Sequence, residues 1–87
     1  MFVHEDVLET FGFIKDVGVM SNDAIGFTAF DQDGELVLVK DDSGMEFTVT
    51  TVGIFEFDVS ITTDTWNQFV PGFRSIDEAI TWIIEGV

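Results

Sequence analysis

Two glycine-containing turns enclose a short apolar run near the middle of the sequence, in DQDG-ELVLVK-DDSG over residues 31–44. Aspartate and glycine favour tight turns, because aspartate side chains bond to nearby backbone and glycine readily adopts positive φ angles. The run between the turns, residues 35–40, is dominated by valine and leucine, and an apolar run bounded by turn signals is typical of a strand. The pattern therefore predicts a central strand with a hairpin at each end.

The same pattern extends to both sides of this strand. Four further β-branched and aromatic runs, separated by turn residues, lie at residues 13–20, 25–30, 45–52 and 54–61. Gly18 interrupts the first of them. Short runs at regular spacing, with turn signals between them, are typical of an antiparallel meander. We therefore expect about five strands.

A short helix is expected near the N-terminus. Val7, Leu8 and Phe11 recur at helical spacing, and Val3 extends the same face by one turn. Gly12 follows the last apolar residue and is a helix stop signal. An edge strand is the alternative interpretation of this segment.

A second helix is expected at the C-terminus. Ser75 and Glu78 have the spacing of a capping box, in which the serine hydroxyl accepts the backbone N–H three residues later and the glutamate side chain reaches back to the serine N–H. Apolar residues then recur at helical spacing: Ile76, Ala79, Ile80, Trp82, Ile83 and Val87. A long aromatic-rich loop over residues 62–73 is expected between the last strand and this helix. The predicted fold is a single α+β domain of residues 1–87, in which the C-terminal helix packs on one face of the sheet.

The charge balance excludes several classes of protein. Among 87 residues, 17 are Asp or Glu and three are Lys or Arg, which gives a net charge of −14. Direct binding to nucleic acid requires a basic footprint that three cations cannot supply. An anionic membrane surface would repel such a chain. We therefore expect neither nucleic acid nor membrane as a direct partner, although an acidic or salty habitat would also explain the excess charge.

The sequence also lacks targeting and disulfide signals. No apolar run approaches the roughly 20 residues of a membrane span, and the acidic start lacks the basic flank of a signal peptide. The chain has no cysteine, which excludes disulfides and thiolate zinc sites. We expect a cytoplasmic protein, in the host cytoplasm if a phage encodes it.

No catalytic, cofactor-binding or metal-binding residue is predicted. His4 is the only histidine and lies near a terminus, where fraying would prevent it from being held as a general base. No glycine-rich loop carries the lysine of a phosphate-binding loop. Acids alternate over residues 31–35 as in calcium loops, but the glycine comes at position four instead of six. Weak binding of a divalent cation at the aspartate-rich turns stays open.

Two features suit recognition of a protein partner. The first is the charge density. Duplex DNA carries one charge per about 1.7 Å of its axis, so roughly seven base pairs carry as much negative charge as this chain. The second is a tryptophan in the aromatic loop, because tryptophan is enriched at the centres of interfaces. The predicted contact residues are Asp31, Asp33, Glu35, Asp41, Asp42 and Trp66. The alternative is that the acids only solvate the turns, while Phe69 and Phe73 cap a small core.

In composition and architecture the chain is similar to the small acidic inhibitors that phages encode against host enzymes. That resemblance implies a non-enzymatic protein, a monomer or small homo-oligomer, which mimics DNA and fills the basic nucleic-acid groove of a restriction or CRISPR effector. The alternative is a structural or assembly protein that self-associates through a sheet edge or the aromatic loop. A small enzyme that uses a pair of acids is a third hypothesis.

Overall fold

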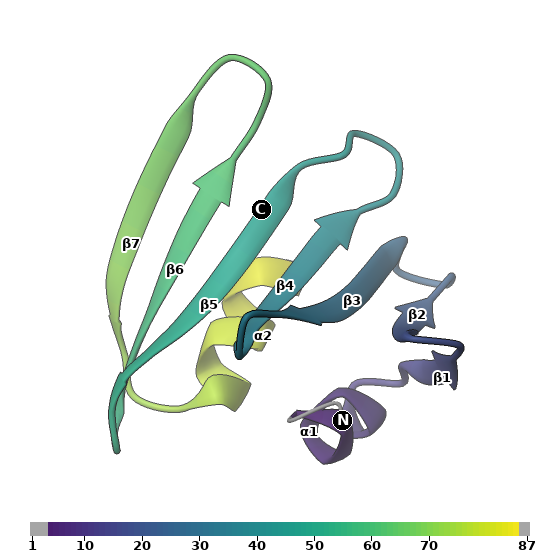
Figure 1. Cartoon of the computed structure of the whole chain (residues 1–87), viewed down its shortest axis with the longest axis horizontal. Coiled ribbons are helices and arrows are strands. Elements are labelled where there is room, and N and C mark those ends of the chain that lie inside the picture. The colour runs from purple at the N-terminus through teal and green to yellow at the C-terminus, as the bar shows by residue number, and fades with distance from the viewer. Residues whose placement is uncertain (1–3, 86–87) are drawn as a thin grey trace.

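A computed structural model describes residues 4–85 as a seven-stranded sheet with a helix near each end of the chain (Figure 1). In chain order the elements are α1 (Glu5–Thr10), β1 (Ile14–Asp16), β2 (Val19–Asn22), β3 (Phe27–Gln32), β4 (Glu35–Lys40), β5 (Glu46–Gly53), β6 (Glu56–Thr62), β7 (Asn67–Phe73) and α2 (Ile76–Glu85). Each strand pairs antiparallel with the next one along the chain. The α+β meander is therefore confirmed, but with seven strands instead of about five.

One additional strand arises because the first predicted strand is in fact a hairpin. The expected run over residues 13–20 folds back at Val17 and Gly18, whose φ of +72° suits the turn. Residues 21 and 22, which were expected to begin a turn, continue β2. The Asn22 side chain stabilises this arrangement, because its Nδ2 donates to the Phe11 carbonyl at 3.0 Å and its Oδ1 accepts from the Ala24 N–H at 3.1 Å.

The second additional strand replaces most of the expected aromatic loop. After a turn at residues 63–66 the chain forms β7, which pairs with β6 only and is the edge strand at this side of the sheet. Pro71 and Gly72 lie at an irregularity in the pairing, between Val70 and Phe73, which both have partners in β6. A proline is tolerated there because an edge strand with a bulge does not need every backbone N–H.

Side chains from the strands and from both helices form one core. Phe27 and Phe47 lie at its centre, with ring centroids 6.1 Å apart. α2 packs against β5, β6 and β7, as expected for its apolar stripe. The buried core residues are Leu8, Phe13, Met20, Phe27, Ala29, Leu36, Leu38, Phe47, Val49, Val59, Ile61, Phe73, Ala79, Ile80 and Ile83. Phe73 is therefore a core residue, whereas Phe69 of β7 is 59% exposed.

The helix ends follow the sequence signals. Gly12, with φ +86°, ends the α1 segment as expected. The Ser75 Oγ accepts the Glu78 N–H at 3.1 Å, which confirms the cap of α2. Val3 and Val87, which were expected to extend the two apolar faces, lie outside the described residues. Within residues 4–85, neither helix is long and apolar enough to cross a membrane.

Removing the Phe47 ring should destabilise the fold strongly. Phe47 is fully buried, and truncating a buried phenylalanine to alanine typically costs about 3–5 kcal/mol. We expect Phe47→Ala to lower the free energy of unfolding by that amount in urea titrations followed by circular dichroism. The matched control is Phe55→Ala, because Phe55 is 78% exposed and surface changes stay within about 0.5 kcal/mol. Equal losses in the two variants would contradict this description of the core.

The α2 cap gives a second test of the fold. Ser75→Ala removes the acceptor of the Glu78 N–H and should lower the free energy of unfolding by about 1 kcal/mol. Ser75→Asn keeps a capping oxygen and should restore most of the loss. Thermal unfolding of the three proteins in one buffer measures both effects, and a loss that asparagine does not restore would speak against the cap.

Candidate partner-binding surfaces

Successive turns of the meander alternate between the two ends of the sheet (Figure 1). The turns after β2, β4 and β6 form one end, which we call the Trp66 end (residues 23–26, 41–45 and 63–66). The turns after β1, β3 and β5 form the other, which we call the Asp33 end (residues 17–18, 33–34 and 54–55).

The six predicted contact residues are divided between these ends. Asp41, Asp42 and Trp66 lie at the Trp66 end. Asp31, Asp33 and Glu35 lie at or beside the Asp33 end. The six residues of β4 separate the two ends by about 20 Å, at roughly 3.4 Å per residue. The structure therefore does not bring all six together.

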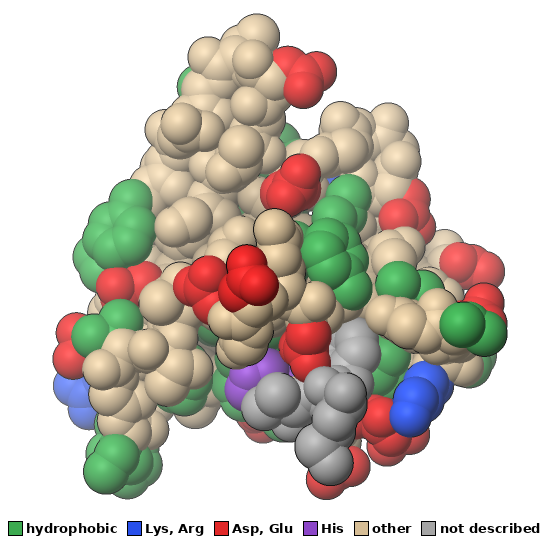
Figure 2. All heavy atoms as spheres, viewed as in Figure 1, with side chains coloured by type: hydrophobic (Ala, Val, Ile, Leu, Met, Phe, Trp, Pro, Cys, Tyr) green, Lys and Arg blue, Asp and Glu red, His purple; other side chains and the backbone are tan. Residues whose placement is uncertain are grey.

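Acidic side chains are spread over the whole of the face seen in Figure 2. With 17 acidic and three basic residues in the chain, most carboxylates have no cation to pair with. Among residues 4–85 one ion pair forms, between the Lys15 Nζ and the Glu5 Oε1 at 3.0 Å. No charged side chain among them is buried, so the negative charge lies at the surface. Such a surface repels itself and attracts cationic partners over long distances.

The Trp66 end combines a fixed tryptophan with acidic turns. Trp66 is 46% exposed, and its backbone is held by Thr63, whose Oγ1 accepts the Trp66 N–H and donates to the Trp66 carbonyl, both at 3.0 Å. Asp41 and Asp42 are exposed in the turn after β4, three strand spacings or about 14 Å from the turn of Trp66. Asp41 also accepts the Thr28 hydroxyl at 2.8 Å. This end therefore presents an aromatic ring in one turn and two carboxylates in another turn of the same end, about 14 Å away.

The acids at the Asp33 end have structural roles. Asp33 and Gly34 have φ angles of +53° and +84°, as a two-residue hairpin turn of type I′ requires. The Glu35 carboxylate accepts the Thr50 hydroxyl across the strands at 2.5 Å. The turn conformation alone therefore explains why an aspartate stands at position 33, and no binding partner is needed to explain it.

The Asp33 end also carries an apolar tip that the sequence pattern did not reveal. Ile54 and Phe55 were expected to begin a strand, but they form the turn between β5 and β6. They are 86% and 78% exposed, and Val52 beside them is also exposed. Gly53 indicated a turn between the two predicted runs, but it is the last residue of β5, and the turn falls on the two apolar residues that follow, which carry no Asn-Gly or Asp-Gly signal.

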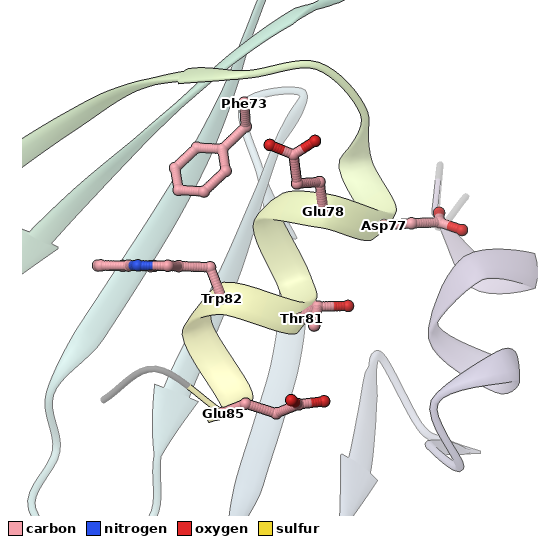
Figure 3. A pocket seen from close by; sticks show the side chains of 6 residues that line it. All are labelled: Phe73, Asp77, Glu78, Thr81, Trp82 and Glu85. Atoms are coloured by element: carbon pink, nitrogen blue, oxygen red, sulfur yellow. The ribbon is translucent and has the colours of Figure 1, made fainter.

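A third surface is an open hollow on the outer side of α2 (Figure 3). It has a volume of about 630 Å³ and is lined by Phe73, Asp77, Glu78, Thr81, Trp82 and Glu85. The rings of Phe73 and Trp82 are tilted against each other, with centroids 5.6 Å apart. Trp82 was expected only as part of the apolar stripe, yet it is half-buried and contributes to this hollow. The spacing of Glu78, Trp82 and Glu85 at i, i+4 and i+7 was the available signal.

No metal site emerges from the described residues. Between residues 4 and 85, no three histidine, aspartate or glutamate side chains form a group that could hold a metal ion. His4 lies at the N-cap of α1, where its side chain makes no capping hydrogen bond.

Comparisons with protein-family models, with curated proteins and with solved structures gave no match to this chain. Its function therefore has to be inferred from its own surfaces.

The unbalanced charge should make stability depend on salt. The longest dimension of the described chain is 31 Å, and the Debye length falls from about 30 Å at 0.01 M salt to about 8 Å at 0.15 M. At the lower concentration the carboxylates therefore repel one another across the whole molecule. We expect the melting temperature to rise as NaCl is added over this range. A melting temperature that stays constant or falls would mean that the repulsion is unimportant.

Proposed function

We propose that this chain is a non-enzymatic binding protein whose anionic surface fills the nucleic-acid groove of a basic enzyme, as duplex DNA would. The observation that carries the proposal is the density of surface charge. The described residues measure 31 × 29 × 24 Å, and the chain has a net charge of −14. A 31 Å length of duplex DNA carries about 18 phosphates at one per 1.7 Å, so the two objects have similar size and charge.

The Trp66 end is the surface that best suits this role. Its carboxylates, Asp41 and Asp42, would pair with lysine and arginine in the groove, and Trp66 would supply the buried aromatic contact that strong interfaces contain. The hydrogen bonds from Thr63 hold the Trp66 backbone in place before binding, which lowers the entropy that association costs.

The electrostatics suit a fast-acting inhibitor. A negative surface facing a positive groove is steered into place, so association is rapid at low salt and slows as salt is added. A chain without cysteine needs no oxidising compartment, and we propose that it acts in the cytoplasm. A phage-encoded inhibitor of a restriction or CRISPR effector would act there in its host.

The test is a pull-down with the tagged full chain from a lysate of the native or host cell, followed by mass spectrometry. We expect one nucleic-acid enzyme in stoichiometric amount at low salt, displaced either by moderate salt or by competing duplex DNA. An enzyme that stays bound when duplex DNA is added would contradict binding in the groove, and recovery of no partner at either salt would contradict the proposal as a whole.

A matched pair of variants tests the Trp66 end itself. The variant Asp41→Asn/Asp42→Asn/Trp66→Ala removes two charges and one aromatic ring from this end. The control, Asp33→Asn/Glu56→Gln/Phe55→Ala, removes the same groups from the Asp33 end. We expect the first variant to bind the captured enzyme at least about tenfold more weakly, because central aromatic contacts dominate interfaces, and the control to lose less than about threefold. Equal losses of affinity in the two variants would mean that binding depends on total charge and not on the Trp66 end.

Self-association is the second candidate function, and the exposed apolar residues favour it. Ile54 and Phe55 form one such site, and Phe69 on the edge strand β7 forms another. The two functions respond to salt in opposite directions, because salt weakens contact with a basic partner but screens the repulsion between two acidic copies. Sedimentation at low and high salt distinguishes them. A monomer under both conditions excludes the assembly function.

A further inference from the structure

The geometry points to the hollow on α2 as an anchor site for an arginine-bearing segment of the partner protein. The hollow lies on α2, away from the turns that form the Trp66 end. The inference rests on the proposed function in one respect, namely that the partner is a basic protein.

Aromatic rings form the apolar part of this hollow. In Figure 3 the Phe73 ring lies above the Trp82 indole, both to the left of the α2 helix, and Phe73 is itself anchored in the core. A half-buried tryptophan face is the best aromatic partner for a cation. Because the rings pack against each other, they are held in position before a ligand arrives.

Carboxylates supply the polar part of the hollow. Glu78 lies beside the Phe73 ring, and Asp77 and Glu85 extend from the same helix (Figure 3). None of the six lining residues is basic. The combination of aromatic faces with carboxylates and without a counter-charge is complementary to a cation that carries apolar or planar surface.

Glu85 gives an independent indication that these acids serve binding. Asp77 and Glu78 lie in the first turn of α2, where negative charge stabilises a helix. Glu85 lies in the last turn, where negative charge opposes the helix dipole, and no basic residue accompanies it. Residues that break a local rule of stability are expected at functional sites.

Arginine fits this arrangement better than lysine. Its planar guanidinium can stack on the Trp82 indole while its N–H groups bond to carboxylates in a bidentate manner. Lysine offers a strongly hydrated point charge that cannot stack. The volume of about 630 Å³ exceeds that of one side chain, so the occupant is a short segment that carries arginine.

The test is a titration of the ¹⁵N-labelled full chain with blocked hexapeptides of alternating glycine and arginine, followed by NMR. Matched peptides contain lysine, with the same charge, or citrulline, with the same shape and no charge. We expect the Trp82 indole N–H signal to shift with the arginine peptide, affinity for the lysine peptide to be about threefold to tenfold lower, and no binding of the citrulline peptide. Equal affinity for arginine and lysine, or an unmoved Trp82 signal, would overturn the inference.

Variants locate the binding without disturbing the core. Glu78→Gln/Glu85→Gln leaves the Ser75 cap intact, because the cap uses the Glu78 backbone N–H. It should lower the affinity for the arginine peptide about threefold to tenfold, as expected for the loss of two exposed charge pairs. The matched control Asp16→Asn/Asp33→Asn removes the same charge from exposed positions at the Asp33 end and should change the affinity less than twofold. Equal effects of the two variants would mean that the peptide is attracted by the overall negative charge and is not bound in the hollow, which would overturn the inference.

Two further readouts keep the outcomes separate. Glu85→Gln should leave the melting temperature unchanged or raise it, so that its weaker binding is not a loss of fold. Arg74 is the arginine that a second copy of this chain would insert into the hollow. If the chain forms a dimer and Arg74→Gln dissociates it, a second copy occupies the hollow, which would overturn the inference. If the pull-down recovers a DNA-displaceable enzyme that the Glu78→Gln/Glu85→Gln variant binds normally, the anchor site is wrong and the proposed function stands. If the pull-down recovers no enzyme while the arginine peptide still binds at Trp82, the proposed function is wrong and the anchor site stands.

Discussion

The apolar layer between α2 and strands β5 to β7 has to hold together a chain with a net charge of −14. Each large apolar side chain buried there contributes about 1.5–3 kcal/mol, and self-repulsion of the carboxylates opposes that gain. No charged residue between positions 4 and 85 is buried as a whole, although one carboxylate oxygen each of Asp31 and Asp58 is. The core therefore determines the fold, and the acids can be arranged on the surface largely independently of it.

The elements with strong local signals were predictable. The turns at Gly34 and Gly44 have the positive φ angles that their sequences indicated, and Ser75 caps α2 through the expected hydrogen bond. The two missed strands have weak local signals. A glycine in a run of eight residues is equally compatible with an interrupted strand and with the β1–β2 hairpin at Gly18. Pro71 indicates a loop unless the strand lies at an edge, and only the finished sheet shows where its edges are.

The features of the candidate surfaces likewise divide into those that the sequence predicted and those that it did not. The separation of Asp33 from Asp42 follows from the two hairpins themselves, because turns at opposite ends of one strand cannot meet. That Asp41 and Asp42 share an end with Trp66 also follows from the predicted strands, because two of them, now β5 and β6, lie between the two turns. The hollow on α2 depends on Phe73, which reaches the helix only because β7 is a strand that ends beside it. Exposure of the tip at Ile54 and Phe55 likewise depends on where the turn after β5 falls, which Gly53 alone did not determine.

The order of the sheet has a consequence for how quickly the protein becomes active. Each strand pairs with the strand that precedes it in the chain, so every hairpin can close over a short loop at small entropic cost. Sheets built from such local pairings fold faster than sheets of the same size whose neighbouring strands are distant in sequence. α2 then docks on β5, β6 and β7, the strands just before it. A chain of this topology can acquire its fold hairpin by hairpin as it leaves the ribosome, and under the proposed function it would then be ready for its partner soon after synthesis.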